Sequence, residues 1–254
     1  MRNIVLWLAI GCCIWLSACK KELSVEAAPP IITLQFSNVA GSTPLVLNTG
    51  TYTDFDAESY SVTAFKYYIS NIQLISLNGT FQSVPGIYHL VDASDSASQS
   101  LSFIASADSV IALSFLIGVD SAQDVSKSQP GDLSPSKGMY WNDTAGYIMA
   151  ELQGTSSAST GAGGLFQYQI GGFKGSYNVL RTATLALPGA PFTLLPEKAD
   201  TLLVSISANV NAWFQGQHIL TIAQNPSCTA PGVLASEFAD NYSMMFSVTN
   251  AQIK

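Results

Sequence analysis

Charged side chains are scarce in this chain. They make up 11% of its 254 residues, against roughly a quarter in ordinary soluble domains. The balance is acidic, with 10 Lys and Arg against 17 Asp and Glu. A nucleic-acid partner is therefore excluded, because a protein that binds nucleic acid needs a basic surface to displace counterions. Disorder is excluded as well, since 48% of the residues are hydrophobic and can supply a core.

Histidine and catalytic motifs are also nearly missing. The only histidines are His89 and His218. The chain has no His-Glu-x-x-His, no Gly-x-Ser-x-Gly, and no lysine in its glycine-rich run at 161–164 that could make a phosphate loop. Few side chains could then serve as a base for a nucleophile. We expect a protein that binds rather than catalyses.

The amino terminus reads as an export signal. One positive charge at Arg2 precedes an apolar run at 4–16, which is too short for the roughly 20 residues of a spanning helix. Leu-Ser-Ala-Cys at 16–19 then resembles the lipobox of bacterial lipoproteins. We predict that residues 1–18 are removed as a signal peptide and that Cys19 carries the lipid, which attaches the chain to a membrane.

The expected location is the cell envelope. Lys20-Lys21-Glu22 is only a weak match to the surface-export tag of some Bacteroidetes-type lipoproteins. The periplasmic face of the outer membrane and the cell surface therefore both stay open. Removal of the signal leaves 9 basic and 17 acidic residues, because Arg2 is the single charge lost.

Cysteines cannot form a disulfide framework. Cys12 and Cys13 leave with the signal and Cys19 is lipidated, so only Cys228 is left. Cys228 lies in a turn-like stretch without a neighbouring Cys or His. We expect a half-buried free thiol, with a metal or redox role as the alternative.

The mature chain alternates in short segments that are typical of β-strands. Residues 19–30 read as a tether, and from Ile31 polar and apolar residues alternate. A turn is expected at Asn71 and a hairpin at Asn78-Gly79, and 120–138 and 153–164 read as polar loops, the second of them mobile. Strands are predicted near 31–36, 60–77, 87–91, 110–119, 146–152, 165–171, 178–187, 201–210, 218–223 and 244–249.

These strands predict an all-β fold in one domain over 31–254. The expected architecture is an antiparallel β-sandwich, immunoglobulin-like or jelly-roll-like, with one short C-terminal helix. The helix is predicted from Leu234, Phe238 and Tyr242, which follow one another at four-residue spacing.

Several stretches, in order, resemble the MbnP-like family. They are Phe65–Ile72 ("YYISNI"), Tyr88–Asp92, Leu116–Asp120 ("LGVD"), Gly138–Trp141 with Gly146–Ile148 ("GMxWxWxxGY"), Phe166–Gly172 ("FxFHIGG"), Trp213-Phe214 and the segment 228–246. The resemblance implies an exported β-sandwich that binds copper. For some members it also implies a di-haem peroxidase-type partner, and it makes Trp141 a candidate redox-active or partner-facing aromatic.

This chain departs from the family pattern where a metal would be held. Gln169 stands where the family often has His, Asp143 replaces a second Trp, and Ser37-Asn38 fall near the usual place of a first-strand His. An amide is a poor copper ligand. The copper site is therefore expected to be weakened or lost.

The candidate metal ligands left are His89, His218, Asp120 and Gln169. Each of these residues could instead have a purely structural role. The two histidines could be ordinary residues of a strand and of a loop edge, and Asp120 could stabilise a turn or cap a helix. Asp120 and Asp124 together could also bind calcium. Trp141 could instead be a core plug. A surface protein-interaction or glycan-binding module without metal is the competing function, suggested by low charge and Ser/Thr/Gly-rich loops.

Overall fold

The computed structural model describes residues 28–105, 107–124 and 129–254. The predicted signal peptide, Cys19 and most of the tether lie outside these residues. The described chain is dominated by strands, as predicted. Its two helices are α1 (Ser121–Asp124) and α2 (Val233–Tyr242), and no helix among the described residues has the length and apolar composition to cross a bilayer.

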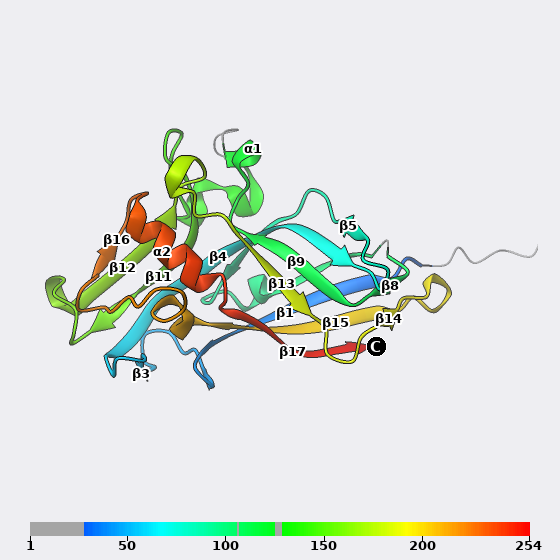
Figure 1. The fold of residues 1–254 in the computed structure, drawn as a ribbon, viewed down its shortest axis with the longest axis horizontal. Helices are drawn as coiled ribbons and strands as arrows, with labels where there is room; N and C mark the ends of the chain where they lie inside the picture. The colour runs from blue at the N-terminus through cyan, green and yellow to red at the C-terminus, as the bar shows by residue number, and fades with distance from the viewer. Residues whose placement is uncertain (1–27, 106, 125–128) are drawn as a thin grey trace, which may run out of the picture.

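The described strands form two main sheets and a small ribbon (Figure 1). The first sheet holds β1 (Ile31–Ala40), β2 (Thr43–Pro44), β7 (Ser100–Ile104), β15 (Thr201–Asn209) and β17 (Phe246–Ile253). The second holds β3 (Tyr52–Thr53), β4 (Ser59–Ile75), β5 (Phe81–Ser83), β6 (Tyr88–Asp92), β9 (Ala112–Ile117), β10 (Tyr140–Asn142), β11 (Gly146–Ser156), β12 (Leu165–Gly171), β13 (Arg181–Ala186) and β16 (Ser227–Cys228). The ribbon pairs β8 (Ser109–Val110) with β14 (Phe192–Thr193).

The two main sheets meet through aromatic side chains. Phe36 of β1 lies 6.1 Å from Tyr67 of β4, ring centre to ring centre. Phe246 of β17 lies 5.3 Å from Tyr67 and 5.0 Å from Phe115 of β9. These edge-to-face contacts add to the free energy of burial, and all four rings are buried.

The strand β1 confirms the alternation read from the sequence. Ile32, Leu34 and Phe36 are buried, and the residues between them are exposed or half-buried. Its partner was not foreseen: β1 runs parallel to β15, with Ile31 opposite Thr201 and Val39 opposite Asn209. Alternation fixes which face of a strand is buried but does not specify the neighbour.

Three local predictions were wrong. The backbone at Asn71 does not turn; β4 continues through it as a bulge, with φ of +49° and a register shift against β9. The predicted loop at 153–164 starts late, because β11 extends to Ser156. No strand forms at 218–223, where an isolated bridge joins Gln215 to Ile219.

The hairpin at Asn78-Gly79 and the C-terminal helix are confirmed. Gly79 has φ of +79° between β4 and β5, a conformation that suits glycine. In α2, Phe238 and Tyr242 are buried against Trp213, which ends the 3-10 helix η7 (Val210–Trp213). Figure 1 shows α2 crossing the sheet beside β11 and β12.

The segment before β10 covers part of the opposite face of the second sheet. It includes the 3-10 helices η2 (Gly131–Leu133) and η3 (Pro135–Lys137). Tyr68 of β4 donates a hydrogen bond to the Asp132 carbonyl, and Tyr147 of β11 to the Leu133 carbonyl. The middle of β4 is therefore buried on both faces, from Tyr67 to Ser70. The remaining short 3-10 helices are η1 (Ser96–Gln99), η4 (Ala162–Gly164), η5 (Gly175–Tyr177) and η6 (Pro196–Lys198).

Candidate functional site

A row of polar side chains crosses four strands where this covering segment stops. Asp92 of β6 pairs with Lys66 of β4, Lys66 with Glu151 of β11, and Glu151 with Gln169 of β12. Directly opposite residues in antiparallel strands have Cβ atoms about 5 Å apart on one face. The four side chains therefore form a continuous row on the face that points away from the core.

The charged end of the row is neutralised locally. Lys66 Nζ lies 3.2 Å from Asp92 Oδ2 and donates to the Lys137 carbonyl at 3.3 Å. Burial alone would raise the pKa of Asp92, but hydrogen bonds from Ser94 and the charge of Lys66 outweigh it and lower the pKa. Lys66 is thus committed to one carboxylate and one carbonyl.

Glu151 accepts hydrogen bonds from two glutamines. Gln169 Nε2 donates to Glu151 Oε1 at 3.0 Å, and Gln153 Nε2 donates to the same oxygen. Glu151 is only 5% exposed, and a carboxylate this buried needs such donors to offset lost hydration. Glu151 therefore holds the Gln153 and Gln169 amides at the middle of the row.

Trp141 lies at the other end of the row, on β10. Its indole nitrogen donates to Gln169 Oε1 at 3.4 Å. Its ring approaches β12 so closely that a Cβ on Gly171 would come within 2.6 Å of the indole carbon Cζ3. A glycine at 171 is what admits the ring. Trp141 is half-buried against the core and is neither a full core plug nor free.

Trp141 and Gln169 are thus the two sequence candidates that the fold brings together. The Gln169 amide is used at both ends, since its oxygen accepts from Trp141 and its nitrogen donates to Glu151. Amide and carboxylate oxygens do not provide the nitrogen and sulfur donors that copper favours. Among residues 28–105, 107–124 and 129–254, no group of three His, Cys, Asp or Glu side chains could hold a metal ion. The residues present do not fit a copper centre.

His89 lies away from this row and has two oxygen partners. Its Nε2 is 2.7 Å from the Ser98 carbonyl, and its Nδ1 is 3.2 Å from Asp132 Oδ2. Asp132 Oδ2 also accepts the Leu90 amide at 3.1 Å. His89 therefore ties β6 to two neighbouring loops, and neither ring nitrogen is left for a metal in this conformation.

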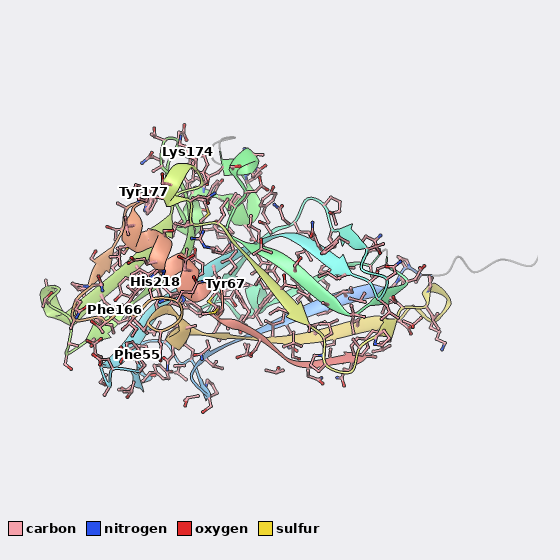
Figure 2. All side chains as sticks on the ribbon, viewed as in Figure 1. Phe55, Tyr67, Phe166, Lys174, Tyr177 and His218 are labelled. Atoms are coloured by element: carbon pink, nitrogen blue, oxygen red, sulfur yellow. The ribbon has the colours of Figure 1, made fainter. Side chains whose placement is uncertain are left out.

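His218 is held by a different acid. Its Nε2 lies 3.2 Å from Asp240 Oδ2, and Arg181 Nε lies 2.7 Å from Asp240 Oδ1. Burial would raise the pKa of Asp240, but Arg181 and His218 together lower it. Figure 2 shows His218 beside α2. The two histidines have different partners among the described residues and form no common site.

Asp120 has the cap role that the sequence gave as its alternative. It accepts the Gln123 amide at 3.0 Å and the Tyr88 hydroxyl at 2.5 Å, which anchors α1 to β6. Asp124 is 2% exposed, and its Oδ2 has no hydrogen-bond partner among the described residues. Burial raises the pKa of Asp124 to about 7, with a smaller contribution from the negative charge of Asp120.

Cys228 is a buried free thiol on β16. Burial raises its pKa to about 11, so the reactive thiolate is disfavoured near neutral pH. The residues in and next to the row that the sequence did not single out are Lys66 and Gln153. Polar residues alternate with apolar ones along β4, β11 and β12, and this alternation is visible in the sequence. The pairing of the strands, which brings these residues together, is not visible in the sequence.

Comparison with known proteins agrees with this architecture. A solved structure, MbnP from Methylosinus trichosporium, superposes with a TM-score of 0.56 at 14% identity, over 88% of this chain and 99% of that one. At that identity the likeness shows the fold. No curated protein matches the chain. The MbnP family model matches residues 29–230, which include every residue of the row. The chain therefore belongs to the MbnP family.

Proposed function

We propose that this chain is a lipid-anchored binding protein of the cell envelope. Gln169, which stands where the MbnP family often has a histidine, makes hydrogen bonds in this chain and does not bind copper. The observation that carries the proposal is the Trp141–Gln169–Glu151 chain of hydrogen bonds. A histidine in place of Gln169 would offer copper a nitrogen donor. The glutamine instead joins an indole to a buried carboxylate, in an arrangement suited to an organic ligand.

Copper titration tests the metal part of the proposal. Calorimetry with Cu(I) and with Cu(II) at tens of micromolar should give no saturable heat. The matched variant is Gln169→His, which restores the family residue and should bind copper more tightly than the parent. Saturable binding by the parent that is lost in Gln169→Ala would overturn the proposal, while binding lost in His89→Ala or His218→Ala would move the metal to another site.

The anchor rests on the lipobox-like sequence at 16–19. About a dozen residues separate Cys19 from the first residue of β1, enough to hold the domain clear of a lipid surface. Mass spectrometry of the native protein should find an amino terminus at Cys19 carrying acyl chains. A Cys19→Ala variant should leave the membrane fraction. A native chain that begins at Met1 would contradict this part.

A di-haem peroxidase-type partner is implied by the family resemblance, and Trp141 is the side chain that it would face. Half-burial leaves part of the indole at the surface, whereas Trp213 is 0% exposed. Intact-mass analysis of native protein would show added oxygen at Trp141 if such a partner acts. An unmodified Trp141 in cells that produce the partner would count against this role and leave the binding function in place.

A further inference from the structure

The outward face of β4, β11 and β12 continues beyond the polar row as an open surface. Below the row lies a second one, in which Gln153 pairs with Ala64 and Gln167. A third follows, in which Thr155 pairs with Ser61 and Leu165. All of these side chains are half-buried or exposed. We call this surface the amide face and define it by Ser61, Ala64, Lys66, Trp141, Glu151, Gln153, Thr155, Leu165, Gln167 and Gln169.

A hollow lies at the end of the amide face farthest from Trp141. It encloses about 370 Å³ and is lined largely by hydroxyl side chains and glycine: Ser59, Ser61, Thr155, Ser156, Ser157, Gly163 and Gly164, with Tyr60. Ser61 and Thr155 belong to both the hollow and the amide face. From Lys66 to Ser61 the strand extends about 17 Å at roughly 3.3 Å per residue. The surface therefore suits an elongated ligand.

The chemistry of the amide face suits a neutral, hydroxyl-rich molecule. Gln167 offers a donor and an acceptor, Gln153 and Gln169 each keep a second amide proton beyond the one donated to Glu151, and Ser61 and Thr155 add hydroxyls. Trp141 offers an apolar ring edged by a polar N–H, held in place by Gln169 and by close packing on Gly171. A pyranose presents the same combination, with C–H groups on its ring faces and hydroxyls around its rim.

Charge argues against other ligand classes. Among the ten residues that define the amide face the one cation is Lys66, which is paired with Asp92, so these residues offer a polyanion no unpaired positive charge. Glu151 is buried and already accepts two hydrogen bonds. The face also lacks the cluster of large apolar anchors that dominates the energy of protein interfaces, since Leu165 and Trp141 lie at opposite ends.

From this placement we infer that the amide face binds a neutral oligosaccharide. Trp141 packs against one sugar ring, the three glutamines hydrogen-bond the following units, and the hydroxyl-lined hollow receives the far end of the glycan. Glu151 is a positioning residue, because it orients the Gln153 and Gln169 amides. The inference rests on the proposed binding function and specifies its ligand class.

The test uses full-length, detergent-solubilised protein and a panel of neutral hexasaccharides built from glucose, mannose, xylose or galactose. Calorimetry should find at least one that binds, and Trp141→Ala should weaken it at least tenfold. The double variant Gln153→Ala/Gln167→Ala should weaken it about fivefold. The control Gln252→Ala, an exposed glutamine of β17 on the other sheet, should leave the affinity unchanged.

A direct readout guards against variants that misfold. In the ¹⁵N spectrum of the protein, the indole N–H of Trp141 should shift on titration, and that of the buried Trp213 should not. Trp141→Phe, which keeps a ring, should retain part of the affinity.

Three outcomes would overturn the inference: no neutral hexasaccharide binds at millimolar concentration, binding is indifferent to Trp141→Ala and to the double variant, or only charged polymers or proteins bind. Failure here with a copper-silent, lipid-bearing protein leaves the proposed function standing. Saturable copper binding lost in Gln169→Ala would remove the proposed function whatever the glycans do.

Discussion

The two faces of β4, β11 and β12 are built from alternate residues of the same strands and differ in almost every respect. Phe65, Leu152 and Tyr168 point inward and are 0% exposed. Their sequence neighbours Lys66, Glu151 and Gln169 point outward. Gln169 donates a hydrogen bond to Glu151, and Lys66 forms an ion pair with Asp92. The inner face buries apolar area, which drives folding. The outer face presents polar groups that can form hydrogen bonds with a ligand.

The inner face is also the more densely aromatic. Tyr168 lies 4.4 Å from Phe238 and 6.4 Å from Trp213, ring centre to ring centre. Trp213 in turn lies 5.1 Å from Tyr242. Stability and recognition can therefore be tested separately, by substitutions one residue apart in the sequence.

The largest effect is expected from Leu152→Glu. A carboxylate would enter the core opposite Phe65 and Tyr168, and burying an unpaired charge should cost more than about 5 kcal/mol. The variant should not accumulate as folded protein, as judged by circular dichroism and expression yield. Glu151→Gln, one residue away, should lose only about 1 kcal/mol. Equal losses would show that the two faces do not differ as described.

Trp213→Ala compares the two tryptophans of the described chain. Trp213 is fully buried, and its truncation should lower the free energy of unfolding by about 3–5 kcal/mol. Trp141→Ala should lower it by about 1–2 kcal/mol, because part of the ring is already exposed to water. Urea denaturation of both variants provides the measurement. A larger loss at Trp141 would make that residue a core plug after all.

The covered and open ends of the outer face should differ in their response to pH. Asp124 lies at the covered end, where Gly146 meets its side chain and the Tyr147 amide donates to it at 3.3 Å. Its pKa is about 7 in the folded chain and about 3.9 when unfolded. Between these two pH values Asp124 is protonated in the folded chain and ionised in the unfolded chain. Its contribution to the free energy of unfolding is therefore fully present below about pH 4 and is lost as the pH rises through about 7.

The expected loss is about 2–4 kcal/mol between pH 4 and pH 8. Asp124→Asn should remove most of this slope and be more stable than the parent at pH 8. The exposed Asp56→Asn is the control and should retain the slope. Melting temperatures across this pH range provide the measurement, and an unchanged slope in Asp124→Asn would assign the titration to another group.

A smaller effect is expected where the two faces share backbone. Gly171→Ala places a methyl group against the Trp141 ring and should cost about 1–3 kcal/mol by overpacking. Because the ring must move, the Trp141 indole N–H resonance should shift, and Trp213 should be unaffected. The same methyl group would also lie 2.8 Å from the Tyr147 carbonyl oxygen, so combining the change with Trp141→Ala should relieve only the part of the cost that is due to the ring. Purely additive losses would contradict the contact.

The strands were predicted best where one face is buried and the other open. In β1 the alternation is clear, and its start and the buried residues Ile32, Leu34 and Phe36 were predicted, although the strand continues past the predicted end to Ala40. Prediction failed where this contrast is absent. Both faces of β4 are covered from Tyr67 to Ser70, and at Asn71, which follows, a bulge inside the strand was taken for a turn. At 218–223 a short apolar stretch packs without pairing, because the Glu58 carboxylate, at 3.1 Å from the Ala223 amide, also accepts the Ile222 amide.

The candidate site was predicted in part. Trp141 and Gln169 were both chosen from the sequence, through a family resemblance, and they do meet. His89, His218 and Asp120 were chosen as well, and each has a structural partner elsewhere. The sequence did not single out Lys66, Gln153 and Gln167. Local sequence does not distinguish polar residues that line up across paired strands from polar residues that only face solvent.

The sequence by itself determined the strand-rich class, the hairpin at Asn78-Gly79, the C-terminal helix and the poverty in metal-binding side chains, because composition and local periodicity carry that information. Only the tertiary structure decided that β1 runs parallel to β15, that a loop covers part of the outer face, and that an indole, an amide and a carboxylate form one chain of hydrogen bonds. Those features depend on which strands pair and in which register, and pairing is settled by contacts between residues far apart along the chain.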